Sequence, residues 1–134
     1  MIPSASAILA TDFETTTQST HTYAMNLTSN RIRGYTDGQD AMKQAIYKIL
    51  NTERYQYIMY SWNYGIELRG LFGQPISYVV PELERRITEA LTWDDRINSV
   101  SDFVFDTSRR GVVAVSFTVN TIYGDVSSET EVNI

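Results

Sequence analysis

The stretch Asn51–Gly73, NTERYQYIMYSWNYGIELRGLFG, decides how the rest of the chain is arranged. It begins with an adjacent acidic and basic residue, Glu53–Arg54, and ends in an apolar run that three glycines interrupt. Between these parts lie the aromatic residues Tyr55, Tyr57, Tyr60, Trp62 and Tyr64. The stretch is too apolar for an ordinary exposed loop and too rich in glycine for one long helix. We therefore predict a compact, irregular connection between two helices.

Amphipathic helices are predicted on both sides of this connection. Before it, apolar residues recur at helical spacing from Ala41 to Leu50, and Asp37 is a suitable N-cap. After it, a second apolar stripe runs from Val79 to Leu91. Pro81 fits only the first turn of a helix, because N–H groups in that turn make no hydrogen bond within the helix and the missing N–H of proline costs nothing there. We therefore expect the second helix to start between residues 77 and 80 and to stop between 92 and 95.

Strand patterns occupy the two ends of the chain. Residues 21–28 and 31–36 are predicted to form a hairpin. Residues 97–106, 112–123 and 126–134 are predicted to form a meander, with its last turn at Gly124–Asp125. The final strand, Val126–Ile134, is only weakly apolar and is expected at the sheet edge. This order predicts an α+β fold: two main helices packed on a small, mainly antiparallel sheet, with an N-terminal hairpin and a C-terminal strand meander.

The composition fits one soluble globular domain. The chain has 134 residues, of which 43% are hydrophobic and 20% charged. We divide it into an extended N-terminal arm, residues 1–20, and a single domain, residues 21–134. The arm, rich in Thr, Ser and Ala, is either a frayed terminus without a role or a segment that orders on a partner. Its start lacks the pattern of a secretory signal, and no window approaches the roughly 20 apolar residues of a membrane span.

Paired carboxylates are the first candidates for catalysis. Glu53 with Glu67, or Asp94–Asp95 with Asp102, would have to lie about 5 to 9.5 Å apart across a cleft. An arginine follows Glu53 directly and another follows Glu67 after one residue. A nearby arginine lowers the pKa of a carboxyl group, whereas a general acid needs a raised pKa. The two adjacent aspartates are more simply a solvated turn after a helix.

Other chemistries lack their sequence signals. There is one histidine, His21, which reads most simply as a surface residue, and there are no cysteines. No serine lies in a GxSxG motif, no ligand spacing for a metal is present, and the glycines form no phosphate-binding loop. The net charge of -5 disfavours binding to nucleic acid. We predict no catalytic residue, no metal site and no cofactor.

The aromatic residues of the connection have two interpretations. They fill a core between the helices and the sheet, or they form a protein-binding surface, since Tyr, Trp and Arg are enriched at interface hot spots. Both can hold for different rings. We expect Glu53–Arg54 and some tyrosines to face a neighbour. The residues expected in the core are Gly65, Ile66, Leu68, Leu71 and Phe72.

Four segments together resemble a known family. They read ILNTERYQY (49–57), WNYGIEL (62–68), LERRITEAL (83–91) and DDRINSV (94–100). In order and spacing they are similar to the baseplate wedge family of contractile phage tails, also called the sheath initiator family. The form YSWNYGIEL (60–68) resembles the branch of Gram-positive prophages and phage-tail-like particles. The resemblance covers about residues 35–123. Thr52 departs from it, because many members have glycine before the glutamate.

The resemblance implies a structural role. It implies several copies in a symmetric ring around the tail hub, assembled in the bacterial cytoplasm as part of the baseplate. Its implied partners are other baseplate wedge subunits, the tail sheath protein and tail hub or tube proteins, with neither nucleic acid nor membrane. The family joins the wedge to the hub and templates the first sheath ring by exchange of strands. The alternatives are a peptidoglycan-cleaving enzyme, as the family's historical "lysozyme-like" label has it, and a binding module unrelated to tails.

Two groups of residues are thereby predicted to bind partners. The Glu-Arg turn of the family contacts a helical bundle of the wedge, and this role carries over to Glu53 and Arg54. The last strand offers its edge to an added strand. The predicted partner-binding residues are Glu53, Arg54, Tyr55, Tyr57, Val126, Glu129, Glu131, Val132 and Ile134.

Overall fold

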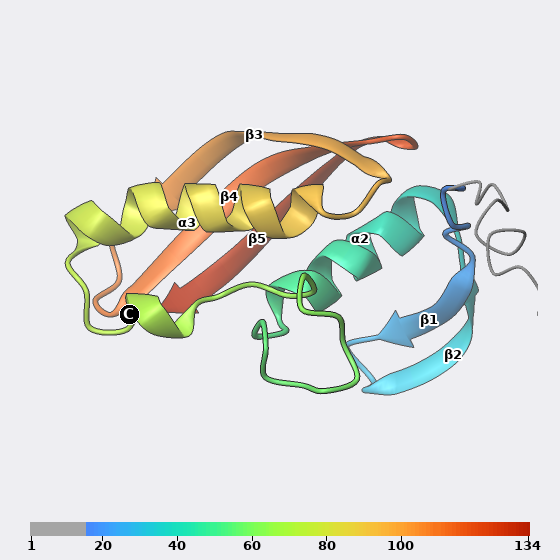
Figure 1. The fold of residues 1–134 in the computed structure, drawn as a ribbon, viewed down its shortest axis with the longest axis horizontal. Coiled ribbons are helices and arrows are strands. Elements are labelled where there is room, and N and C mark those ends of the chain that lie inside the picture. The colour runs from blue at the N-terminus through green and yellow to red at the C-terminus, as the bar shows by residue number, and fades with distance from the viewer. Residues whose placement is uncertain (1–15) are drawn as a thin grey trace, which may run out of the picture.

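Two helices, a three-stranded antiparallel sheet and a separate two-stranded hairpin make up residues 16–134, the part that the computed structural model describes (Figure 1). This is the α+β architecture that the sequence predicts. Residues 1–15 of the predicted arm lie outside the described residues, so the division into arm and domain stays a prediction. Thr20, assigned to the arm, is 2% exposed and its hydroxyl donates a hydrogen bond to Asp37.

The N-terminal hairpin consists of β1 (Thr22–Asn26) and β2 (Arg31–Thr36). The strands pair antiparallel, with one register shift between Tyr23 and Met25. In the turn, the Asn26 side chain accepts hydrogen bonds from the N–H groups of residues 28 and 29. This local capping explains why the chain reverses here. The predicted hairpin is confirmed.

Helix α2 (Gly38–Leu50) begins at the predicted cap, because the Asp37 carboxylate accepts a 2.8 Å hydrogen bond from Gly38 N–H. Helix α3 (Ile76–Thr92) ends where expected but begins at Ile76. Pro81 therefore lies in its second turn, and the predicted first-turn position was wrong. Val79 N–H already bonds the Pro75 carbonyl at 3.0 Å. Burial of Val79 and Leu83, both 0% exposed, offsets the backbone hydrogen bond that Pro81 cannot make.

The three-stranded sheet has the order β3 (Ile97–Asp106), β4 (Val112–Thr121), β5 (Gly124–Asn133). The last strand is at the edge, as predicted. The last turn was predicted at Gly124–Asp125 and this was wrong, since the two-residue loop is Ile122–Tyr123 and β5 starts at Gly124. The buried Thr121 hydroxyl donates to the Gly124 carbonyl at 2.7 Å, which closes the hairpin earlier than the glycine signal indicated.

The core lies between one face of the sheet and the helices. The alternating pattern of β4 is confirmed, because Val113, Val115, Phe117 and Val119 are at most 2% exposed. Figure 1 shows α3 and α2 on one side of the sheet, where α3 contacts β3 and α2 contacts β5. The other face of the three-stranded sheet, which points away from the helices, is mainly polar.

The connection between the helices contributes two fully buried side chains to this core. Ile66 is 2% exposed and Leu71 is 0% exposed, as predicted, and Leu68 packs partly against the core. Phe72 is 71% exposed, so its predicted burial was wrong. The short 3-10 helix η1 (Arg69–Leu71) turns Leu71 inward, and the extended backbone of Phe72 directs the next ring outward.

Candidate functional site

The Glu53–Arg54 turn pairs back onto the segment that follows the aromatic residues. Glu53 and Ile66 form an isolated parallel bridge. Arg54 N–H donates to the Ile66 carbonyl at 3.1 Å, and Ile66 N–H donates to the Thr52 carbonyl at 2.9 Å. The ends of the aromatic segment are therefore joined, and residues 55–64 form a closed loop, which we call the aromatic loop.

Gly65 makes this closure possible. Its φ angle is +98°, a backbone conformation that residues with a Cβ atom rarely adopt. A Cβ atom at this position would lie 2.5 Å from the Thr52 carbonyl oxygen. The glycine is thus required by both the backbone angle and the close approach of the two segments.

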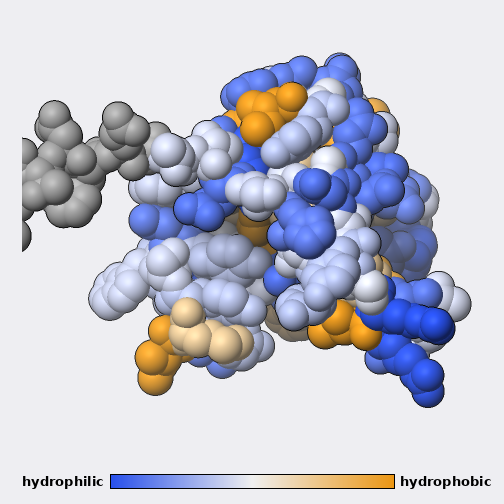
Figure 2. All heavy atoms as spheres, turned by 90° about the vertical axis from the view of Figure 1, so that its right-hand side faces the viewer, coloured by the Kyte–Doolittle hydropathy of each residue, from blue (hydrophilic) through white to orange (hydrophobic). Residues whose placement is uncertain are grey.

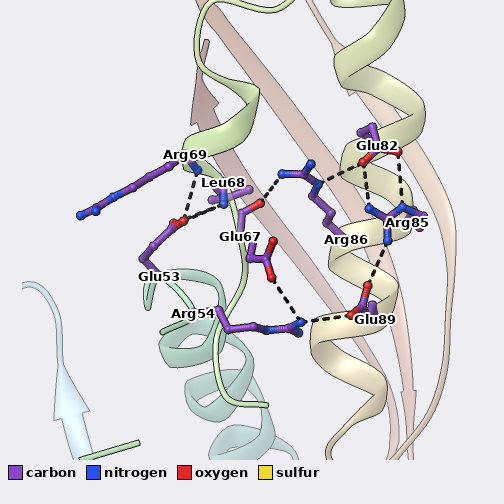
Figure 3. Close-up of polar contacts among 9 residues, drawn as sticks. All are labelled: Glu53, Arg54, Glu67, Leu68, Arg69, Glu82, Arg85, Arg86 and Glu89. Carbon is purple, nitrogen blue, oxygen red and sulfur yellow. Dashed lines mark hydrogen bonds and ion pairs between the residues drawn. The ribbon is translucent and has the colours of Figure 1, made fainter. Parts of the chain in front are cut away.

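The Glu53 carboxylate holds the start of the next element. Its oxygens accept hydrogen bonds of 3.2 Å from the N–H groups of Leu68 and Arg69 (Figure 3). These donors lie at the beginning of η1, where backbone N–H groups have no partner within the helix. Glu53 therefore fixes the path of the chain into the core.

Arg54 is the buried centre of an ion-pair network. Its side chain is 8% exposed, and its guanidinium lies 3.0 Å from Glu89 of α3 and 3.8 Å from Glu67 (Figure 3). Burial by itself lowers the pKa of Arg54, but the hydrogen bond and charge of Glu89 raise it above its usual value. The group is therefore charged. Its Nε atom is buried and has no hydrogen-bond partner within residues 16–134.

A second arginine ties the connection to α3. Arg86 donates from Nη1 to the Glu67 carbonyl at 2.8 Å and pairs with Glu82, four residues earlier in α3, at 3.1 Å. Arg85 bridges Glu82 and Glu89 at 2.9 and 3.1 Å. Arg54 and Arg86 therefore anchor the connection along one side of α3, whereas Arg85 links two glutamates within that helix (Figure 3).

The aromatic loop itself is largely exposed. Ile58 is 104% exposed, Trp62 81% and Met59 78%. Tyr55 has a φ of +68° and its ring meets Trp62 edge-on, with 6.0 Å between ring centroids. A hollow of about 390 Å³ lies among these side chains. It is lined by Tyr55, Tyr57, Ile58, Tyr60, Ser61 and Trp62. The loop thus shows an apolar surface that no other part of residues 16–134 covers.

The β5 edge is the second candidate surface. Within residues 16–134, β5 pairs only with β4, in ten consecutive residue pairs without a register shift. Val126 and Val132 are buried against the core, so their side chains are not available at this edge. Glu129 and Glu131 are exposed, and Glu131 pairs with Arg109 of the turn between β3 and β4 at 3.0 Å.

The predicted site residues therefore fall into two groups, and their partner contacts stay a prediction. Glu53, Arg54, Tyr55 and Tyr57 lie in the connection, whereas Val126, Glu129, Glu131, Val132 and Ile134 lie in or next to β5. Sequence reasoning missed the internal partners of the Glu-Arg pair. The spacing of Glu82, Arg85, Arg86 and Glu89 along one helix was the signal that could have indicated them.

Three of the carboxylates considered for catalysis, those of Glu53, Glu67 and Asp94, are used within the fold. Those of Glu53 and Glu67 face backbone N–H groups and Arg54, as described. Asp94 pairs with Arg96 at 2.6 Å. Burial by itself raises the pKa of Asp94, but the hydrogen bonds from Arg96 bring it below the usual value. Residues 16–134 contain no group of three His, Asp or Glu side chains placed to hold a metal ion, and none of their helices is long and apolar enough to cross a membrane.

Two comparisons with known proteins place this geometry in context. A family model described as "Contractile injection system sheath initiator" matches residues 10–124. The chain is also 35% identical over 116 residues to "Phage-like element PBSX protein XkdS" of Bacillus subtilis (strain 168). That alignment covers 84% of this chain and 82% of the relative.

Proposed function

The chain belongs to the contractile injection system sheath initiator family, and from this premise we propose how it acts in a tail baseplate. It joins the wedge to the hub through the connection between its helices, and it templates the first sheath ring through the β5 edge. It assembles in the bacterial cytoplasm, in several copies around the tail. Its partners are other wedge subunits, hub or tube proteins and the sheath protein.

The observation that carries the proposal is the regularity of the β5 edge. A strand can be added where backbone N–H and C=O groups lack a partner along an unbroken edge. The opposite edge strand, β3, has two register shifts, and Asp102, which lies within the second of them, has a φ of +58°. Bulges of this kind obstruct strand addition. The β5 edge is therefore the better acceptor for a sheath arm.

The hairpin geometry indicates which β5 groups are available. The two-residue loop makes Thr121 and Gly124 the closing hydrogen-bonded pair. Bonded and outward positions then alternate along β5, so the N–H groups of Asp125, Ser127 and Glu129 point away from β4. The side chains at these positions are also exposed.

A proline at an outward position tests the proposal. Glu129→Pro removes one outward N–H group but no hydrogen bond to β4, and proline is tolerated at sheet edges. We expect it to yield baseplates that contain the protein but carry no sheath when tails are imaged by electron microscopy. Glu129→Thr, which keeps the N–H group, is the matched control and should give sheathed tails. Fully sheathed tails from Glu129→Pro would refute the β5 assignment.

The wedge contact is assigned to the aromatic loop, which the Glu53–Arg54 network holds in place. Its ten residues, 55–64, carry no charged side chain, and Trp and Tyr are typical anchors of interfaces. Glu53 and Arg54 support this contact by fixing the loop. The alternative, cleavage of peptidoglycan, has weaker support, because the family is a structural one and the Glu53 carboxylate is occupied by two backbone donors.

A further inference from the structure

The hairpin β1–β2 has one closed edge and one open edge. On the outer edge of β1, Met25 N–H donates to the Gln44 side-chain oxygen at 2.9 Å, and the Gln44 amide donates to the Tyr23 carbonyl at 2.8 Å. The primary amide thus makes the two bonds that a neighbouring strand would make. Helix α2 therefore occupies this edge.

The outer edge of β2, which we call the β2 edge, has no such partner. Within residues 16–134, β2 pairs only with β1, and no side chain from elsewhere bonds to residues 31–36. Residues 31–35 are all exposed, including Ile32 at 69% and Tyr35 at 64%. A two-stranded hairpin is only marginally stable by itself. A third strand would complete it.

The register shows which backbone groups are free. Because Gln44 bonds the outward groups of Tyr23 and Met25, the residues opposite them, Tyr35 and Ile32, also direct their N–H groups away from the hairpin. The register shift places one extra residue on β2 between these two positions. An added strand is therefore short, and side chains must supply much of its selectivity.

The side chains around the β2 edge are mainly basic and aromatic. Residues 16–36 contain Arg31 and Arg33 but no acidic residue, in a chain of net charge -5. The rings of His21, Tyr35 and Tyr23 form a stack, with 5.0 and 5.1 Å between successive centroids. Figure 2, which looks at this end of the molecule, shows a mainly hydrophilic face with separate apolar groups along its lower edge. The two strand edges differ in charge, since β5 contains three acidic residues and no basic one.

We infer that the β2 edge is a second strand-docking site, which accepts an extended acidic segment of a neighbouring tail subunit. Main-chain bonds to Ile32 and Tyr35 hold the segment, and the two arginines select its charge. The opposite charges of β2 and β5 keep the strand meant for one edge from the other. The inference rests on the proposed function in one respect: the partner belongs to the assembled tail.

Hydrogen exchange of the full chain, read by mass spectrometry, tests this. Free protein should exchange the amides of residues 31–36 rapidly, and protein in purified, nuclease-treated tail particles should exchange them at least tenfold more slowly. Equal rates in both samples would overturn the inference. Peptides from β5 are read in the same experiment. Protection of β5 without β2 defeats only this inference, whereas protection of β2 without β5 supports it and defeats the β5 assignment; protection of neither defeats both.

Two pairs of variants test the chemistry. Ile32→Pro removes an outward N–H group and should abolish the protection in particles, whereas Ile32→Ala, which also removes the side chain, should retain it. The double variant R31E/R33E should lose the protection and R31K/R33K should keep it. Unchanged protection in Ile32→Pro, or in R31E/R33E, would contradict the assignment. A photo-crosslinker at position 35 should capture a segment rich in Asp and Glu, and a basic segment there would also contradict it.

Discussion

In the connection between the helices, a charged side chain is buried and aromatic side chains are exposed, which is the reverse of the usual arrangement. Arg54 is 8% exposed at its side chain and is held by two glutamates, whereas Trp62 and Ile58, in the middle of the aromatic loop, are 81% and 104% exposed. Apolar surface of this kind needs a reason, because folding alone would bury it. The charged pair is used within the fold, and we propose that the exposed aromatic residues make a contact outside it.

The largest effect should come from breaking the closure of the loop. Gly65→Ala places a Cβ atom where only 2.5 Å separates it from the Thr52 carbonyl, on a backbone with positive φ. We expect a loss of about 3 kcal/mol in the free energy of unfolding, measured by urea denaturation of the isolated protein.

Gly73→Ala is the control, because it also has a positive φ of +77° but meets no atom within 4 Å. It should cost about 1 kcal/mol, through the backbone angle alone. Equal losses in the two variants would show that the close approach of the two segments does not matter.

The next largest effect should come from the buried arginine. Arg54→Met keeps the aliphatic volume but leaves Glu89 and Glu67 without their shared cation. Since these glutamates are about half exposed, the loss should be about 2 kcal/mol, below the value for a fully buried pair. Urea denaturation of the variant measures it.

Arg85→Met provides the matched control, because Arg85 pairs with Glu89 of the same helix but is 58% exposed. It should cost less than about 1 kcal/mol. If Arg54→Met were as mild as this control, the charged half of the connection would not support the fold, and Glu53–Arg54 would be free for the direct partner contact predicted from the sequence.

The smallest effect on stability should come from the aromatic loop. Trp62→Ser should change the free energy of unfolding by no more than about 0.5 kcal/mol, because the ring is mostly exposed. It should nevertheless weaken binding to the purified wedge subunits by roughly 30-fold, as loss of an anchor worth about 2 kcal/mol implies. Isothermal titration calorimetry reads this change. Trp93→Ser, exposed but outside the loop, should bind normally, and equal affinity of both variants would remove the loop from the interface.

Local patterns predicted the elements because their signals are local. The apolar spacing of α2, the Asp37 cap and the alternation of β4 depend on residues near one another in the chain, and the structure confirms them. The partner of Arg54 lies 35 residues away, so no pattern around Arg54 itself could identify it, and the signal lay in the spacing of charged residues along α3. Phe72 was predicted in the core from its hydrophobicity, yet one turn of η1 places it outside. The sequence resemblance supplied the family but not these internal contacts.

The most direct test of the account is the structure of the assembled baseplate, determined by electron cryomicroscopy. In that structure, a strand from the sheath protein should be hydrogen-bonded along the outer edge of β5, opposite Asp125 to Glu131. A baseplate in which sheath is attached while this edge of β5 faces solvent would contradict it.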